Sequence, residues 1–180
     1  MSKTLVINLF GVPGAGKSTG AAYIFSQIKM RGVNAELITE FAKDKVWEEN
    51  KEVFKNQAYI FGKQSFKLSR CDGKVDVIIT DSPLPLSIFY NKDPRLTENF
   101  NKSVMDVFNS YENKNYLILR VKPYNPSGRH QTKEESDALG EPIKNLLKDR
   151  DIKFEHINGN KEGYEEIISD ILKYLKVEGK

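Results

Sequence analysis

The stretch LFGVPGAGKSTG, residues 9–20, decides how the rest of the chain is interpreted. Glycine packs no side chain and costs backbone entropy, so three glycines within residues 11–16 need a physical reason. Gly11, Gly16, Lys17 and Ser18 fit the pattern G-x-x-x-x-G-K-[ST] of a phosphate-binding loop. In such a loop the backbone N–H groups surround phosphate oxygens, and side chains would block that approach. Because an apolar run precedes the loop and a helical pattern follows it, the stretch predicts a nucleotide phosphate site.

Each part of this loop has a predicted role. Lys17 is expected to reach the β- and γ-phosphates, and the Ser18 hydroxyl is expected to be a ligand of Mg²⁺. The helix that starts near Lys17 adds the positive end of its dipole. The expected nucleotide-binding residues of the loop are Gly11, Val12, Pro13, Gly14, Ala15, Gly16, Lys17, Ser18 and Thr19.

Apolar segments of two kinds alternate along the chain. Short runs predict strands at residues 4–10, 34–39, 75–80, 115–121 and 153–157. Helical spacing of apolar residues predicts helices at 17–31, 51–70, 96–112 and 133–149, with a last one near the C-terminus. This alternation indicates an α/β fold of three layers, in which helices cover both faces of a five-stranded parallel sheet. Ligands of such sheets bind at the carboxyl ends of the strands.

Composition limits the class of protein. A length of 180 residues suggests one domain, 1–180, and a net charge of +3 gives little support to a nucleic-acid or membrane partner. One cysteine excludes an internal disulfide and suits a reducing compartment, so we expect a cytoplasmic protein. We find neither a signal peptide nor an apolar run long enough to cross a bilayer. His130 and His156 have no metal-ligand spacing, which argues against structural zinc.

Two acidic residues follow predicted strands. Asp81 ends VDVIITD, where a carboxylate can hold Mg²⁺ through water or can cap the next turn. Ser82 follows it in place of the glutamate that activates water in many ATP-hydrolysing motors, which disfavours a motor. Glu40 ends LITE. It is either a general base for a substrate hydroxyl or an acidic residue at a helix N-terminus, where the helix dipole favours negative charge.

A polar segment, VKPYNPSGRHQTKEES at 121–136, has the character of a lid. Phosphoryl transfer needs positive charge around the migrating group and the exclusion of water, and a lid with an arginine supplies both. Arg129 is the candidate, against the alternative of a plain surface arginine. Arg120 is a second candidate, with a buried ion pair equally open, and Lys133 could assist. We place the lid near residues 122–140.

Further residues could contact the nucleotide base or the acceptor. The NGN loop at 158–160 could read the base, with Asn158 as the candidate, or could be a simple entry to the next helix. An acceptor pocket could be lined by Phe41, Lys45 and Gln64, although solvent exposure or helix packing would also explain these residues.

Five segments run in the order found in small P-loop kinases: GVPGAGKST (11–19), TEFAK (39–43), QAYIFGKQ (57–64), IITDSPLPLSIFY (78–90) and NPSGRHQT (125–132). The chain resembles the nicotinamide riboside kinase-like family and, more distantly, deoxynucleoside and thymidylate kinases. The resemblance implies the P-loop NTPase fold, ATP and Mg²⁺ as donor, Glu40 or Asp81 near the acceptor, and Arg129 in the lid. The chain departs from the riboside type at YNPSG and DSPL. Its compact form would suit a bacteriophage or bacterial protein.

Three functions follow from these features. The leading hypothesis is a kinase that transfers the γ-phosphate of ATP to a nucleoside, a nucleotide or a similar small acceptor. A second is a polynucleotide kinase acting on a DNA or RNA hydroxyl. A third, of another class, is a GTP- or ATP-controlled switch, but NKDP (91–94) has its acid one position early for guanine recognition and DSPL (81–84) lacks the required glycine. The acceptor and the oligomeric state are left open.

Overall fold

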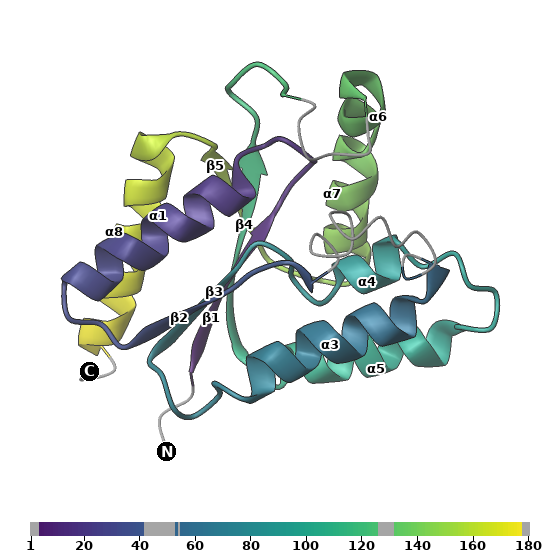
Figure 1. The fold of residues 1–180 in the computed structure, drawn as a ribbon, viewed down its shortest axis with the longest axis horizontal. Helices are drawn as coiled ribbons and strands as arrows, with labels where there is room; N and C mark the ends of the chain where they lie inside the picture. The colour runs from purple at the N-terminus through teal and green to yellow at the C-terminus, as the bar shows by residue number, and fades with distance from the viewer. Residues whose placement is uncertain (1–3, 42–52, 54, 126–131, 178–180) are drawn as a thin grey trace.

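Five parallel strands form one sheet in the order β2-β3-β1-β4-β5, as Figure 1 shows. The computed structural model describes residues 4–41, 53, 55–125 and 132–177. The predicted α/β fold with a five-stranded parallel sheet is confirmed. The strands are β1 (Leu5–Phe10), β2 (Ala35–Ile38), β3 (Val77–Thr80), β4 (Glu112–Leu119) and β5 (Glu155–Asn158).

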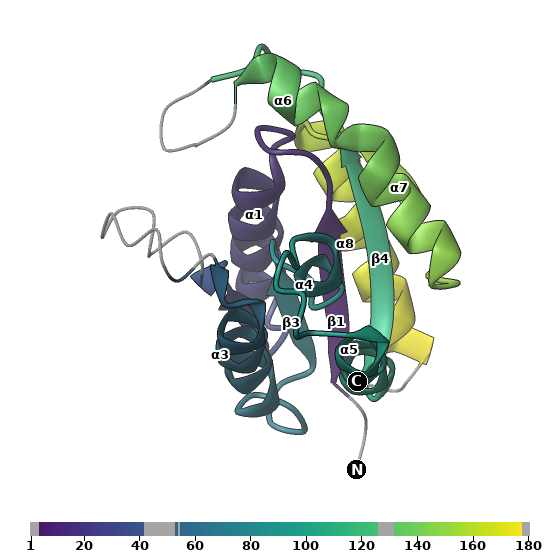
Figure 2. The same cartoon turned by 90° about the vertical axis from the view of Figure 1, so that its right-hand side faces the viewer.

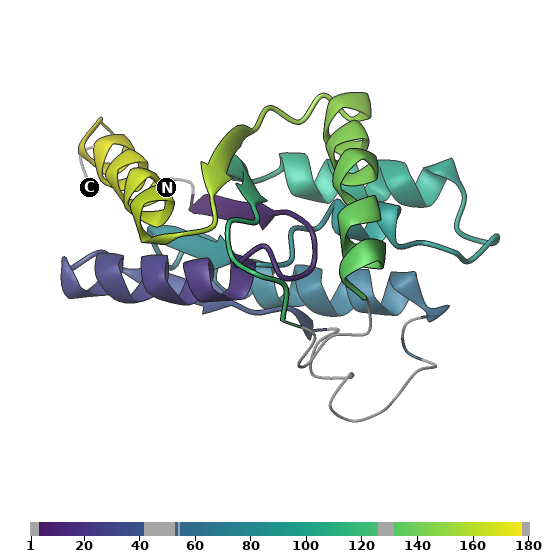
Figure 3. The same cartoon turned by 90° about the horizontal axis from the view of Figure 1, so that it is seen from above.

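Helices cover both faces of the sheet, which gives the expected three layers (Figures 1 and 3). One face carries α1 and α8, which lie side by side, and the other carries α3, α4, α5 and α7. Alternate residues of β1 explain the division, since Leu5, Ile7 and Leu9 face α1 and α8 while Val6 and Phe10 face the other layer. The helices are α1 (Lys17–Met30), α3 (Gln57–Ser69), α4 (Leu86–Phe89), α5 (Glu98–Asn109), α6 (Lys133–Ala138), α7 (Gly140–Asp149) and α8 (Lys161–Val177).

Strand β4 begins at Glu112, earlier than the start at residue 115 that its apolar run predicts, and it ends at Leu119 rather than 121. The early part is polar but is held by a cluster of amides. Asn8 Nδ2 on β1 donates to Asn113 Oδ1 at 2.9 Å and to Asn115 Oδ1 at 3.0 Å. Because these amides satisfy one another across the strand pair, polar residues extend the strand beyond its apolar run.

The predicted helix at 133–149 is two helices, α6 and α7, separated at Leu139. Pro142 supplies a physical reason, because proline has no N–H to donate to the preceding turn and is tolerated only in the first turn of a helix. Helix α6 leads into α7 with a bend between the two, as Figure 2 shows. The Ser136 hydroxyl of α6 donates to the Pro13 carbonyl oxygen, so α6 lies against the glycine loop that follows β1.

Helix α3 begins at Gln57, whereas the apolar pattern predicts a start near residue 51. Asn56 caps the helix, since its Oδ1 accepts the backbone N–H of Tyr59 at 3.0 Å. The short helix α4 was not predicted, because it has only four residues, which directly follow Pro85. Helix α5 is shorter than the predicted span of 96–112.

Candidate active site

The sheet register brings three loops to one edge. Ile38 of β2, Thr80 of β3 and Asn8 of β1 lie in one row across the sheet. Asp81 comes one residue after Thr80, Glu40 two residues after Ile38, and Gly11 three residues after Asn8. Because the strands are parallel, the glycine loop and both predicted acids leave the sheet at the same end.

The glycine loop, residues 11–18, joins β1 directly to α1 (Figure 1). Its backbone adopts φ values of 144° at Gly11, 80° at Gly14 and 105° at Gly16, which side chains strongly disfavour. A Cβ atom on Gly11 would also lie 2.7 Å from the Ile118 carbonyl oxygen of β4. The glycines of the motif are therefore required by the conformation and by the close approach of β4.

Helix α1 presents its positive end to this loop. It begins at Lys17, and no acidic residue lies in its first turn. The residue before it is Gly16, which has no side chain to cap the first N–H groups, so these donors remain available for an anion. The Lys17 ammonium lies across the loop, where it donates to the carbonyl oxygens of Gly11 at 2.7 Å and Val12 at 3.1 Å. This arrangement suits the binding of phosphate.

Asp81 and Glu40 meet beside the loop. Asp81 is 4% exposed, and its Oδ1 accepts the backbone N–H of Glu40 at 3.0 Å. The buried carboxylate thus fixes the segment after β2, and Glu40 itself is half-buried. Both predicted acids lie at the site, one holding the backbone of the other.

Gln64 of α3 holds the same segment from the outer side. It is buried, its Oε1 accepts the N–H of Phe41 at 3.2 Å, and its Nε2 lies 3.4 Å from Thr80 Oγ1. Both the oxygen and the nitrogen of this amide therefore have partners in the protein. Gln64 was predicted to line the acceptor pocket, and with these partners it would act on an acceptor through Phe41. The Phe41 ring packs edge-on against Tyr59, with ring centroids 5.6 Å apart.

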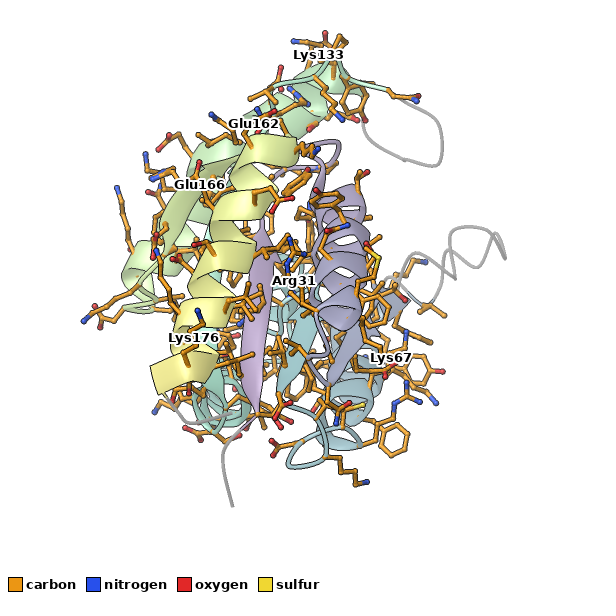
Figure 4. The ribbon with its side chains drawn as sticks, turned by 90° about the vertical axis from the view of Figure 1, so that its left-hand side faces the viewer. Arg31, Lys67, Lys133, Glu162, Glu166 and Lys176 are labelled. Carbon is orange, nitrogen blue, oxygen red and sulfur yellow. The ribbon has the colours of Figure 1, made fainter. Side chains whose placement is uncertain are left out.

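Lysine side chains border these rings. Lys67 Nζ lies 5.7 Å from the centroid of the Phe41 ring and donates to the Thr39 carbonyl oxygen at 3.2 Å. Figure 4 shows Lys67 on the outer side of α3. Two other candidates, Lys45 and Arg129, lie outside the described residues.

Tyr90, which sequence reasoning did not assign to the site, has its hydroxyl under the influence of Glu40. Burial raises the pKa of the Tyr90 hydroxyl to about 12, and the negative charge of Glu40 contributes to the rise. The side chain follows α4, and its ring packs against Phe89 with centroids 4.9 Å apart. Tyr90 therefore stays a neutral phenol beside the acid at neutral pH.

The loop after β5 packs against the glycine loop. The Gly159 N–H donates to the Leu119 carbonyl oxygen at 2.8 Å, and a Cβ atom at Gly159 would collide with the Ala15 carbonyl oxygen and lie 2.9 Å from that of Leu119. Asn158, predicted to face the base, is exposed at the end of β5.

Replacing Gly159 with alanine is expected to destabilise the fold by about 1–3 kcal/mol or more, because backbone atoms on both sides cannot move away cheaply. Chemical denaturation followed by circular dichroism measures the change. Gly62→Ala is the matched control, since a Cβ atom there meets nothing within 4 Å and the glycine lies inside helix α3. That control should gain about 0.5–1 kcal/mol. Equal stability of Gly159→Ala and the parent protein would contradict the close packing.

Arg120, just beyond β4, is held by helix α6. Its guanidinium pairs with Asp137, and its Nη1 donates to Ser136 Oγ at 3.2 Å. The Arg120 side chain is only 13% exposed, and the Tyr124 ring lies 5.3 Å below its guanidinium carbon. Of the two alternatives that the sequence left open, the structure shows the ion pair.

Helix α6 in turn touches the glycine loop. The Ser136 hydroxyl is fully buried and donates to the Pro13 carbonyl oxygen at 2.8 Å. The helix starts with a capping box, in which Thr132 Oγ1 accepts the N–H of Glu135 at 3.2 Å while Glu135 accepts the N–H of Thr132 at 2.7 Å. Lys133, predicted to assist the lid, pairs with Asp137.

The residues present fit a magnesium ion accompanied by a nucleotide. Among the described residues, the Ser18 hydroxyl makes no hydrogen bond and is exposed, and no hydrogen bond reaches Asp81 Oδ2. In the same part of the chain no group of three or more His, Cys, Asp or Glu side chains could hold a metal. Mg²⁺ suits this pattern, since it binds few protein oxygens and completes its shell with phosphates and water.

A protein-family model described as an AAA domain, AAA_28, matches residues 6–166. The chain belongs to the AAA_28 family. No curated protein matches its sequence significantly. The family match covers the glycine loop, both acids and the first turns of α8, so the site described above lies within the AAA_28 domain.

Two solved structures resemble the AAA_28 domain. One is the deoxyadenosine kinase from M. mycoides with bound dATP, with a TM-score of 0.57, 19% identity, and coverage of 93% of this chain and 99% of that one. The other is the same kinase with products dCMP and a flexible dCDP, with a TM-score of 0.52, 19% identity, and coverage of 96% and 99%. The family match shows membership of the AAA_28 family, and the two structures show that the fold of this chain is like that of the deoxyadenosine kinase.

Several residues of the AAA_28 domain site were not found from the sequence. Thr132 and Glu135 carry a detectable signal, because a threonine followed three residues later by glutamate is typical of a capping box. Ser136 and Tyr90 carry no comparable signal, since Ser136 contacts Pro13 and Tyr90 is influenced by Glu40, both of which are distant in sequence. No helix in the described part of the chain is long and apolar enough for a membrane span.

Proposed function

We propose that the protein is an ATP-dependent kinase that transfers the γ-phosphate of Mg-ATP to a nucleoside, a nucleotide or a related small molecule. The observation that carries the proposal is the meeting of Glu40 and Asp81 beside the glycine loop, where Asp81 accepts the Glu40 N–H at 3.0 Å. A phosphate-binding loop next to a pair of acids supplies what phosphoryl transfer requires, namely a held donor and a base for the acceptor. The family match and the kinase fold support the same conclusion.

The donor side of the proposed site consists of the glycine loop and Asp81. Backbone N–H groups and Lys17 would bind the phosphates, and Ser18 and Asp81 would hold Mg²⁺, which balances charge on the phosphates when bound. Asn158 is the proposed contact to the base, because it ends β5 and precedes Gly159, which lies against Ala15 of the glycine loop. The solved relative with bound dATP is consistent with a nucleotide here.

The acceptor side consists of the segment after β2. We assign Glu40 as the general base, because it is half-buried and its backbone is fixed by Asp81 while its side chain influences Tyr90. Phe41 and Lys45 follow it and are the proposed walls of the acceptor pocket, with Gln64 holding the Phe41 backbone. Arg129, in a lid near residues 122–140, would stabilise the charge on the migrating phosphate.

A screen with γ-labelled ATP tests this function directly. The purified protein is incubated with Mg²⁺ and with separate panels of nucleosides, nucleotides and 5′-hydroxyl DNA and RNA ends, and products are identified by mass spectrometry. Label on a nucleoside or nucleotide is the expected result. Label on a polynucleotide end would move the acceptor to DNA or RNA, and that activity should then fall steeply with salt because phosphate contacts release counterions. Failure with every acceptor, together with tight GTP binding, would replace the kinase with a switch.

A further inference from the structure

Some carbonyl oxygens of the glycine loop accept hydrogen bonds from the same part of the chain. The Gly20 N–H donates to the Gly16 carbonyl oxygen at 2.8 Å, and the Ala15 N–H donates to that of Val12 at 3.1 Å. Because a loop that turns its N–H groups inward to phosphate points its carbonyl oxygens outward, toward the protein, neighbouring elements can add further donors. Two hydroxyl groups, from α6 and α8, donate to the Pro13 and Gly16 carbonyl oxygens.

The first hydroxyl belongs to Tyr164, in the first turns of α8. Its Oη donates to the Gly16 carbonyl oxygen at 3.0 Å, and the side chain is 3% exposed. The ring fills space left by two glycines, since a Cβ atom on Gly16 would lie 2.5 Å from its Oη and one on Gly20 would lie 2.5 Å from its ring. Burial raises the pKa of the Tyr164 hydroxyl, so it remains protonated and able to donate.

The second hydroxyl belongs to Ser136 of α6, which is fully buried and donates to the Pro13 carbonyl oxygen at 2.8 Å. Its orientation is fixed, because the same oxygen accepts from Arg120 Nη1 at 3.2 Å and Arg120 pairs with Asp137. Figure 4 shows that the start of α6, marked by Lys133, and the first turn of α8, marked by Glu162, lie at the same end of the molecule. The two helices thus approach the loop from one end of the fold, and their hydroxyls reach different carbonyls.

We propose that Ser136 and Tyr164 are positioning residues that brace the glycine loop at Pro13 and at Gly16, so that its N–H groups are aligned for phosphate before the nucleotide arrives. The proposal rests on the nucleotide-binding part of the proposed function and not on phosphate transfer. The two braced carbonyls flank Gly14 and Ala15, at the centre of the loop. Without either hydroxyl, residues 14 and 15 are expected to fluctuate more in the free protein. Ordering them when the nucleotide binds then costs free energy, which lowers the affinity.

The test removes single oxygen atoms. Tyr164→Phe and Ser136→Ala each delete one hydroxyl with little change of shape. Two controls match them: Tyr23→Phe removes a hydroxyl that bonds Glu165 between the same helices α1 and α8, and Ser103→Ala removes a helix hydroxyl that donates to the Asn99 carbonyl at 2.9 Å. Isothermal titration calorimetry gives the Kd for Mg-ATP, and thermal unfolding gives Tm for every protein.

We expect the Kd for Mg-ATP to rise by about 3- to 10-fold in each brace variant, which is the effect of losing one neutral hydrogen bond. The Kd of each control should stay within about twofold of the parent value. Amide hydrogen exchange in residues 11–18 of the nucleotide-free protein should accelerate in the brace variants and stay unchanged in the controls.

A purely structural role would lower Tm in the brace variants while leaving the Kd and the loop exchange unchanged, and that result would overturn the proposal. A parent protein that binds Mg-ATP but phosphorylates no acceptor would contradict the proposed kinase, while the Kd comparison would still decide on the braces. A parent protein that binds no nucleotide would overturn both.

Discussion

Replacing Lys17 with alanine is expected to abolish measurable phosphate transfer, with a loss on the order of 10²–10³-fold or more. The Lys17 ammonium lies across the glycine loop, held by the carbonyl oxygens of Gly11 and Val12. In a bound complex this cation would move to the β- and γ-phosphates, where charge develops during transfer. Alanine removes the cation together with its hydrogen bonds to the Gly11 and Val12 carbonyl oxygens. Initial rates with γ-labelled ATP and the acceptor found in the screen measure the effect.

The matched control is Lys29→Ala, which removes the ammonium of an exposed lysine from the last turn of the same helix α1. It changes the net charge by the same amount and should leave the rate within about twofold, as for a surface substitution. An unchanged rate in Lys17→Ala would remove the glycine loop from the mechanism.

Replacing Glu40 with glutamine is expected to slow transfer by about 10²- to 10⁴-fold while the Kd for Mg-ATP stays nearly the same. Glutamine keeps the size of the side chain and the backbone N–H that Asp81 accepts, but it cannot take a proton from a substrate hydroxyl. The loss should therefore appear in the rate of transfer and spare donor binding. Single-turnover kinetics with saturating Mg-ATP, together with calorimetry, separate the two.

Two further variants make the Glu40 result decisive. Glu36→Gln changes a half-buried glutamate on β2, the strand that precedes Glu40, and should leave the rate unchanged. Asp81→Asn keeps an oxygen for the Glu40 N–H but loses the charge proposed to hold Mg²⁺, so it should raise the Mg²⁺ concentration needed for half-maximal rate. A normal rate in Glu40→Gln with a lost rate in Asp81→Asn would assign the base to Asp81.

Much of the donor side was predictable from sequence because the determinants are local. The glycine motif, the strand before it and the helix after it lie within residues 5–30, and periodicity places each of them. Asp81 and Glu40 were placed at one edge by the rule that parallel strands share their carboxyl ends. The register of Ile38, Thr80 and Asn8 bears out that placement.

The support of the loop was not predictable, because it depends on contacts between distant residues. Ser136 donates to Pro13, which lies 123 positions away in the sequence, and the sequence predicts one continuous helix where α6 and α7 are separate. The ion pair of Arg120 with Asp137 likewise joins the segment after β4 to α6. The start of β4 was predicted too late for a similar reason. Its first residues are polar, and Asn113 is held in the strand by a hydrogen bond from Asn8 of β1.

The proposed donor site depends on binding of a nucleotide triphosphate by the backbone N–H groups of the glycine loop. A crystal structure of the protein with Mg²⁺ and a non-hydrolysable ATP analogue would show that binding. We expect phosphate oxygens within hydrogen-bond distance of these N–H groups, with the Lys17 ammonium moved from Gly11 and Val12 to the phosphates. A nucleotide bound elsewhere, with Lys17 still on those carbonyls and the loop closed by protein atoms, would contradict it.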